Sequence, residues 1–250
     1  MKRILTIDQG NTAAKAVVFD GDTVVETLRF DSFGVEQAAA LLARTDPYGV
    51  AYCAVGHMDA RLAESLARMA PRVMICSSRT PVPMRIDYAT PHTLGIDRVC
   101  AALGACTLYP EETMLVADAG TALTLDIAAP GPSFLGGTIS AGAAMRLRAL
   151  NAYTHRLPLV EPTPSPEADP QFGTDTASAL RIGALRGAAA EIADAARRAR
   201  RAFGATRLLL TGGEATALYP YIDSPELTPE SQPNLVALGL KSIFIYNETK

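Results

Sequence analysis

The stretch that decides the fold of this chain is Ile4-Leu5-Thr6-Ile7-Asp8-Gln9-Gly10-Asn11-Thr12. A similar pattern recurs at Met114-Leu115-Val116-Ala117-Asp118-Ala119-Gly120-Thr121. In both copies an aspartate closes a short apolar run, a glycine follows two places later, and a threonine leads towards a second apolar run. Such a glycine lets backbone amides approach a phosphate without a side chain in the way. Two turns of this kind, facing each other, would clamp a nucleoside triphosphate and its metal.

Composition narrows the class of protein. The 250 residues are 48% hydrophobic, enough for a substantial core in one large domain or two smaller ones. A net charge of −3, from 23 basic and 26 acidic residues, gives no electrostatic footprint for nucleic acid. No apolar run approaches a membrane span, and the run before Asp8 is too short for a signal peptide. We therefore expect a cytoplasmic protein whose partner is a small molecule or another copy of itself.

Cysteine and histidine spacing does not indicate a metal centre. The four cysteines include no Cys-x-x-Cys pair, so reduced and mostly buried thiols are favoured over metal ligands. The three histidines share no ligand spacing and are interpreted as ordinary surface or hydrogen-bonded residues. These residues are Cys53, Cys76, Cys100, Cys106, His57, His92 and His155.

The order of the expected elements repeats from one half to the other. Each half begins with three strands in an antiparallel meander, followed by helices and shorter buried strands. In the first half we expect strands at 3–8, 14–19, 23–30, 50–55 and 72–76, and helices at 36–44, 59–69 and 96–108. In the second half we expect strands at 114–118, 122–128, 134–139 and 208–210, and helices at 141–150 and 176–203.

Breaks in the pattern suggest where the halves meet. Residues 157–172 contain five prolines and predict an irregular surface loop, and 219–234 is a second weak stretch. The expected boundary lies near 109–113, which gives an N-terminal half at 1–110 and a C-terminal half at 111–250. Neither a Gly-x-x-x-x-Gly-Lys-[Ser/Thr] loop nor a strand–Gly-x-Gly-x-x-Gly–helix unit occurs, so the common nucleotide folds built on them are disfavoured.

Five segments, taken together, resemble one known family. They are Asp8 to Thr12 with Lys15 beyond, Tyr88 followed by Gly95-Ile96-Asp97-Arg98, Asp118 to Thr124, Thr176, and Leu210-Thr211-Gly212-Gly213. In this order and at these spacings they resemble the type III pantothenate kinases, within the superfamily of acetate and sugar kinases, Hsp70 and actin. The sequence departs from the family pattern at Gln9, at Cys53 and at Asp175, where asparagine is usual.

The resemblance implies an α/β protein with two similar ribonuclease-H-like halves, the actin-like ATPase fold, each a mixed sheet with an N-terminal antiparallel meander and flanking helices. It implies transfer of the γ-phosphate of ATP to the primary hydroxyl of pantothenate, giving 4'-phosphopantothenate, the first step of coenzyme A biosynthesis. It also implies Mg²⁺, a monovalent cation (K⁺ or NH4⁺) and a homodimer.

Residue roles follow from the same resemblance. The first phosphate loop and the threonine of the second would bind ATP: Asp8, Gln9, Gly10, Asn11, Thr12, Ala13, Ala14, Lys15 and Thr121. Pantothenate would contact Tyr88, Gly95, Ile96, Asp97, Arg98 and Thr176. Asp8 would act through Mg²⁺ or a water held beside the triphosphate, and Asp118 would hold the monovalent cation. The turn from Leu210 to Gly213 would lie on the adenosine side of ATP. Asp97 would be the catalytic residue, accepting the proton of the substrate hydroxyl as the new bond to phosphorus forms.

Each assignment has a plainer structural alternative. Asp8 and Asp118 could be turn-forming aspartates, and Lys15 a solvated strand lysine. Asp97 could be a helix N-terminal aspartate paired with Arg98. Thr176 could simply cap the helix at 176–203.

Two other functions also stay open. One is a kinase of the same superfamily for another hydroxyl substrate. The other is a nucleotide-binding regulator that has kept the fold and lost catalysis.

Overall fold

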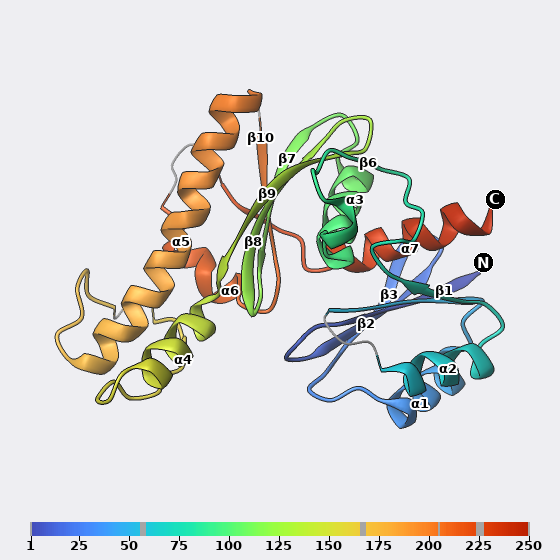
Figure 1. The fold of residues 1–250 in the computed structure, drawn as a ribbon, viewed down its shortest axis with the longest axis horizontal. Helices are drawn as coiled ribbons and strands as arrows, with labels where there is room; N and C mark the ends of the chain where they lie inside the picture. Colours follow the sequence, from blue (N-terminus) through green and yellow to red (C-terminus); the bar gives the residue numbers. More distant parts are fainter. Residues whose placement is uncertain (1, 56–58, 166–168, 205, 224–227, 250) are drawn as a thin grey trace. The chain divides into compact units, whose positions relative to one another are not determined.

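The computed structural model describes residues 2–55, 59–165, 169–204, 206–223 and 228–249, and the chain divides into two compact units (Figure 1). The first unit comprises Met1–Pro110, Gly131–Phe134 and Asn234–Lys250, and the second comprises Glu111–Pro130 and Leu135–Pro233. This division differs from the expected halves 1–110 and 111–250, because residues 131–134 and 234–250 pack with the first unit.

The first unit contains a five-stranded mixed sheet in the order β3-β2-β1-β4-β5. Its strands are β1 (Arg3–Gln9), β2 (Ala14–Asp20), β3 (Thr23–Phe30), β4 (Gly49–Ala54) and β5 (Val73–Cys76). The first three form the expected antiparallel meander, and β4 and β5 join in parallel to β1. The carboxyl ends of β1 and β4 therefore lie side by side, which brings Asp8 next to Cys53.

Two helices, α1 (Val35–Thr45) and α2 (Ala60–Met69), cover one face of this sheet (Figure 1). Alternate residues of the meander supply the apolar side of their interface, as the period of two along a strand requires. The buried cluster includes Leu5, Ile7, Ala16 and Val18 of the sheet with Leu41, Leu42, Leu62 and Leu66 of the helices. The core of the first unit thus fixes which way Asp8, at the end of β1, projects.

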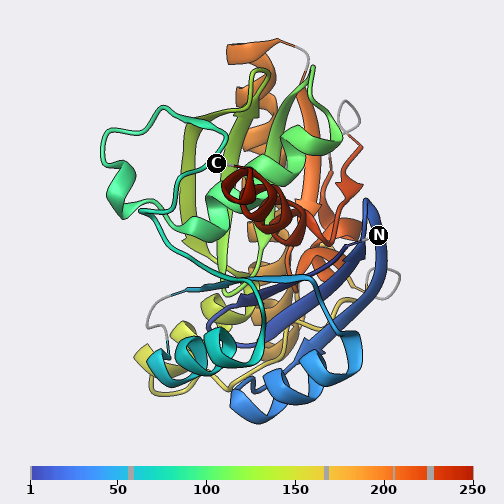
Figure 2. The ribbon, with the colours of Figure 1, turned by 90° about the vertical axis from the view of Figure 1, so that its right-hand side faces the viewer.

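The helices α3 (Ile96–Leu108) and α7 (Leu235–Glu248) pack closely on each other within the first unit (Figure 2). Glycines allow this approach. A Cβ at Gly104 would collide with the Leu235 backbone, and one at Gly239 would collide with the Cys100 backbone. Ala237 of α7 also joins a small buried cluster with Val17 and Phe19 of β2. The helix that carries Asp97 therefore rests on a segment from the far end of the chain.

The second sheet repeats the scheme of the first. Its order is β11-β10-β7-β8-β9-β6, so β9-β8-β7-β10-β11 corresponds to β3-β2-β1-β4-β5. The strands are β6 (Arg85–Ile86), β7 (Thr113–Ala119), β8 (Ala122–Ala129), β9 (Ser133–Ala141), β10 (Thr206–Thr211) and β11 (Glu230–Ser231). The pair β7–β8 is antiparallel and β10 is parallel to β7. The expected duplication of an α/β half is confirmed.

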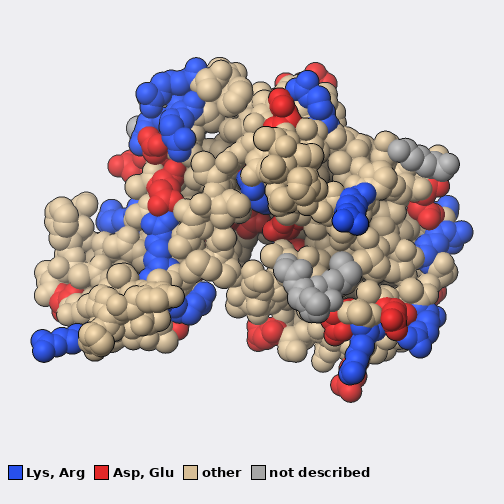
Figure 3. Space-filling model, viewed as in Figure 1, with Lys and Arg blue, Asp and Glu red and all other residues tan. Residues whose placement is uncertain are grey.

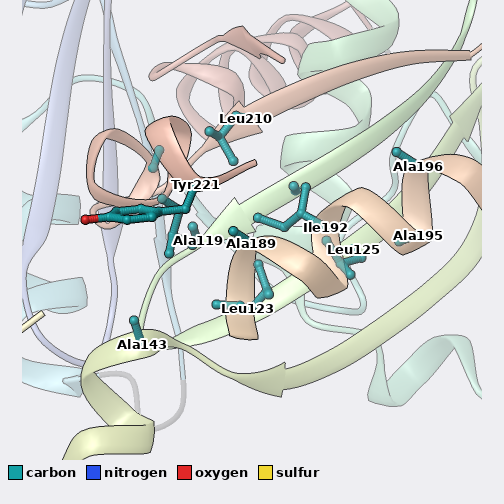
Figure 4. Packing of buried hydrophobic residues seen from close by; sticks show 14 of the residues in the cluster. Ala119, Leu123, Leu125, Ala143, Ala189, Ile192, Ala195, Ala196, Leu210 and Tyr221 are labelled. Atoms are coloured by element: carbon teal, nitrogen blue, oxygen red, sulfur yellow. The ribbon is translucent and has the colours of Figure 1, made fainter. Parts of the chain in front are cut away.

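Helix α5 (Thr176–Phe203) supplies more residues to the buried cluster of the second unit than any other element does. Its small and branched side chains lie over the sheet, with Ala189 and Ile192 near Leu123 and Leu125 of β8 (Figure 4). The alanine-rich face of α5 is therefore a core face. The remaining short elements are α4 (Ala143–Tyr153), α6 (Ala215–Leu218), η1 (Pro91–Thr93) and η2 (Tyr219–Tyr221).

Helix α5 ends as expected at Gly204, which has a φ of 80°. Basic side chains gather over this end of the helix (Figure 3), where they complement the helix dipole. Arg198 pairs with Asp194 at 2.8 Å on the same exposed face, as expected for a solvated helix end. Within the described residues, no helix is both long and apolar enough to cross a membrane.

Candidate active site

The first phosphate loop is a tight four-residue connection between β1 and β2. The Gly10 N–H donates to the Ala13 carbonyl at 3.0 Å, and Asn11 and Thr12 are exposed at the tip. Asp8 and Lys15 are cross-strand partners in the register, so their side chains project from the same face. The polar side chain at Gln9 has an internal role, because the Tyr52 hydroxyl donates to Gln9 Oε1 at 2.7 Å.

Asp8 is a half-buried carboxylate in an environment that disfavours its charge. Burial raises its pKa from 3.8 to about 6, and the negative charge of Asp97 adds to this rise. The Cys53 thiol donates to Asp8 Oδ1 at 3.4 Å and, with the positive charge of Lys15, partly offsets the increase in pKa. A carboxylate held in this way gains most from a bound cation, which would restore its charged form.

Asp97 lies in the first turn of α3, immediately after the expected helix start. Gly95 is the N-cap residue, and a side chain there would collide with the Asp97 carboxylate. The helix dipole favours a negative charge at this place. The structure thus brings Asp97 and Asp8, two residues from separate sequence segments, within electrostatic range of each other inside one unit.

Arg98 is 6% exposed and lies between aromatic rings instead of on the surface. Its guanidinium carbon is 5.9 Å from the ring centre of Tyr88 and 5.6 Å from that of Phe134. The two rings pack edge to face at 6.0 Å. Cation–π attraction holds the guanidinium in place. A planar guanidinium held in this way is suited to bind a carboxylate through two hydrogen bonds.

The second phosphate loop is two residues shorter than the first, because only Gly120 and Thr121 lie between β7 and β8. The Gly120 N–H donates to the Ala122 carbonyl at 3.0 Å, and Asp118 and Thr121 are both half-buried. The Gly142 N–H, at the start of α4, donates to the Thr121 carbonyl at 3.1 Å. The loop is therefore supported from outside by the backbone that begins α4.

The turn after β10 packs directly on this second loop. Gly212 has a φ of 94°, and a Cβ there would collide with the Ala119 carbonyl and the Asp118 carboxylate. Both the left-handed backbone and the close approach require glycine at this position. The sequence resemblance placed Leu210 to Gly213 on the adenosine side, and the structure places this turn against the phosphate loop of the same unit.

Thr176 is the first residue of α5 but does not cap it. The cap is Asp175, whose Oδ1 accepts from the Ser178 N–H at 3.0 Å and whose Oδ2 accepts from the Ser178 hydroxyl at 2.7 Å. The simple capping alternative for Thr176 is therefore wrong, since the neighbouring carboxylate makes those bonds. Thr176 instead lines a cavity of about 410 Å³ between α4 and α5, together with Arg146, Leu150, Leu157 and Gly183.

The predicted site residues fall into three groups. The first unit gathers the loop from Asp8 to Lys15 with Tyr88 and the segment from Gly95 to Arg98, and the second contains Asp118 with Thr121. Thr176 lines a cavity whose wall includes neither Asp118 nor Thr121. Among the described residues, no three acidic, cysteine or histidine side chains are grouped to hold a metal.

Sequence reasoning missed some residues that shape this site. Phe134 was expected only as part of a strand, and nothing in its local pattern shows that it packs on Tyr88 and Arg98. Cys53 was noted only as a buried thiol and a departure from the family pattern, although its thiol donates a hydrogen bond to Asp8. All four cysteines are buried thiols outside any disulfide, His92 and His155 are exposed, and His57 lies outside the described residues.

The duplicated sheets are those of the actin-like α/β fold, and the family match makes the protein an ATP-dependent small-molecule kinase. A ROK hexokinase from Thermus thermophilus superimposes with a TM-score of 0.54 at 18% identity, covering 99% of this chain and 100% of that one, which is a likeness of fold. The sequence model of the type III pantothenate kinases matches residues 4–198. The chain belongs to the type III pantothenate kinase family.

Two curated members of the family show the extent of the match. The type III pantothenate kinase of Porphyromonas gingivalis (strain W83) is 36% identical over 244 residues, covering 97% of this chain and 98% of the relative. The type III pantothenate kinase of Phocaeicola vulgatus is 32% identical over 244 residues, covering 98% of each. The similarity thus extends past both phosphate loops and includes α7.

Proposed function

We propose that this protein transfers the γ-phosphate of ATP to the primary hydroxyl of pantothenate, the step that opens coenzyme A biosynthesis. Membership of the family supports this activity. The observation that carries the assignment of the site is that Asp97 and Asp8 belong to one unit, where the charge of Asp97 helps to raise the pKa of Asp8. One carboxylate is suited to a hydroxyl and the other to a cation on the phosphates. Their separate roles follow from their positions at a helix start and a strand end.

In this proposal Asp97 orients the pantothenate hydroxyl and accepts its proton as the oxygen bonds to the γ-phosphorus. Phosphoryl transfer depends mainly on positioning and on neutralising charge, so a correctly held carboxylate suffices. Backbone amides of the first loop, from Asn11 to Ala13, would lie along the phosphates, with Lys15 as a point charge. Arg98, held by its two aromatic neighbours, would bind the pantothenate carboxylate.

The residues present fit the expected cations. Asp8 is a hard oxygen donor whose pKa is raised for lack of a positive neighbour strong enough to offset burial, so Mg²⁺ would suit it. Bound there, Mg²⁺ would neutralise charge on the phosphates. Asp118 is the corresponding acid of the second loop and would hold K⁺ or NH4⁺. Phosphate oxygens and water would complete both shells.

A homodimer is part of the proposal. Large apolar side chains are exposed on and beyond α4, including Leu150 at 40% and Tyr153 at 90%. A second copy covering them would remove this surface from water. Thr176 lies on the cavity beside Leu150, so pairing there would also change the surroundings of this proposed pantothenate contact.

Use of ATP and four reduced thiols support a cytoplasmic location.

The test is an assay of ADP release by the purified protein with pantothenate, run in potassium and in sodium. We expect pantothenate-dependent turnover that requires Mg²⁺ and is faster in potassium. Turnover with an amino sugar but not with pantothenate would establish the alternative function, a kinase of the same superfamily for another hydroxyl substrate. Binding of ATP with no turnover on either substrate would favour a regulator that has lost catalysis.

A further inference from the structure

Glu214, the residue directly after the Gly212-Gly213 turn, joins three parts of the second unit. Its Oε2 accepts from the Ala143 N–H at 2.7 Å, and its Oε1 accepts from the Ala144 N–H at 3.0 Å. Its own N–H donates to the Ala119 carbonyl at 2.7 Å. One residue therefore connects the turn after β10, the start of α4 and the second phosphate loop.

The carboxylate of Glu214 supplies a cap that α4 otherwise lacks. Gly142 is the N-cap residue and has no side chain to satisfy the first amides of the helix. A carboxylate at this end also gains from the positive pole of the helix dipole. Because Glu214 takes the Ala143 and Ala144 amides, those amides are not free to bind a phosphate group.

The second phosphate loop packs closely against the backbone on two sides. On one side, a Cβ at Gly142 would collide with the Gly120 carbonyl and would lie 3.0 Å from Glu214 Oε2. On the other side, Gly212 packs on Ala119 and Asp118. The loop is held between two backbones, and the Glu214 side chain ties those two backbones together.

We propose that Glu214 is a positioning residue for ATP, which fixes the second phosphate loop so that Thr121 presents a preformed phosphate site. Glu214 acts through Ala119 and the start of α4 and does not touch the nucleotide. This inference rests on the proposed function, because it takes the second loop to be a phosphate loop. A preformed loop binds more tightly, since ordering it costs nothing at the moment of binding.

The test compares Glu214→Ala with Asp59→Ala, a matched loss of an acidic helix cap. Asp59 belongs to the first unit and caps α2 by accepting from the Arg61 and Leu62 amides at 2.8 and 3.4 Å. Mg²⁺–ATP binding is measured by calorimetry, and KM for ATP and for pantothenate by ADP release. We expect Glu214→Ala to weaken ATP binding and raise its KM at least tenfold, with KM for pantothenate changed less than twofold.

Two further measurements separate positioning from general stability. Sodium formate, a small carboxylate that can occupy the vacated start of α4, should restore at least a third of the lost ATP affinity in Glu214→Ala. It should have no effect on wild type or on Asp59→Ala, whose ATP affinity should equal that of wild type. Glu214→Gln keeps an acceptor for one amide, and its ATP affinity should fall about threefold. This variant replaces Glu214→Ala in the test if the alanine variant does not fold.

The outcomes are distinct. Unchanged ATP affinity in both Glu214 variants, whatever their thermal stability, would overturn the proposal. An equal rise of both KM values, or the same loss of ATP affinity in Asp59→Ala, would also overturn it. If the wild type binds ATP but does not phosphorylate pantothenate, the proposed function fails while the calorimetric test of Glu214 remains valid.

Discussion

The carboxylate of Asp97 lies at the start of α3, beside Gly95 and within electrostatic range of Asp8. Asp97→Asn keeps the size of the side chain but removes the proton acceptor. We expect kcat to fall roughly 10²- to 10⁴-fold, with the KM values for ATP and pantothenate changed only slightly. Steady-state ADP release measures this. An unchanged kcat would remove Asp97 from its catalytic role.

Asp8 makes stability depend on pH, because its pKa is higher in the folded protein. Its pKa rises from 3.8 to about 6, so between these values the folded state keeps a proton that the unfolded chain has lost. This contribution is fully present below about pH 4 and is lost as the pH rises through about 6. Without nucleotide or Mg²⁺, the free energy of unfolding of Asp8→Asn should rise relative to that of wild type as the pH goes from 4 to 7.5. The total rise should be up to about 3 kcal/mol.

Urea unfolding of both proteins at pH 5.0, 6.0 and 7.5 measures this difference. The variant should lose activity even where it is more stable. Asp59→Asn, which changes an exposed cap, should show no such growing gain with pH. A stability difference for Asp8→Asn that is the same at every pH would contradict the raised pKa.

At the scale of elements, α3 and α7 are held together by glycines. Gly239→Ala would push its new methyl group into the Cys100 backbone, which cannot move without shifting the helix that carries Asp97. We expect a loss of about 1–3 kcal/mol or more in the free energy of unfolding. Gly183→Ala, in α5 with open space around its Cα, should instead stabilise by up to about 1 kcal/mol. Equal effects in the two variants, measured by urea unfolding, would exclude close packing as the cause.

Local patterns were enough to predict some elements and not others. The meander could be predicted because each strand is short, apolar and bounded by turn residues such as Gly10 and Gly21. Helix α7 could not, because apolar residues occupy all of its sides and Lys241 is buried among them, so no amphipathic stripe stands out. The two-residue strands β6 and β11 exist only through pairing with β9 and β10.

Some residues of the candidate site could likewise be predicted from local patterns, and others could not. Asp8, Asp97 and Asp118 could be located because glycines and strand or helix ends mark their positions locally. The partners of these residues could not be, since Cys53, Phe134 and Glu214 act only through contacts with segments distant in sequence. An acidic residue after a double glycine gives no local sign that it caps a helix 70 residues away.

At the scale of the whole molecule, the first unit is discontinuous in sequence. A fragment of residues 1–110 lacks α7, which covers parts of β2 and α3. We expect this fragment alone to show no cooperative unfolding, and the same fragment joined to residues 234–250 by a flexible linker to recover it. Circular dichroism during thermal unfolding measures both. Cooperative unfolding of the shorter fragment would show that α7 is dispensable.

This discontinuity sets an order of events during translation. Residues 1–110 leave the ribosome before α7 exists, and Asn234 follows Pro110 by 124 positions. At about 5–20 residues per second, the growing chain waits roughly 6–25 s before its last helix can dock. Throughout that interval the apolar surface meant for α7 is open to chaperones, so synthesis of the C-terminal segment is the step that completes the half of the molecule made first.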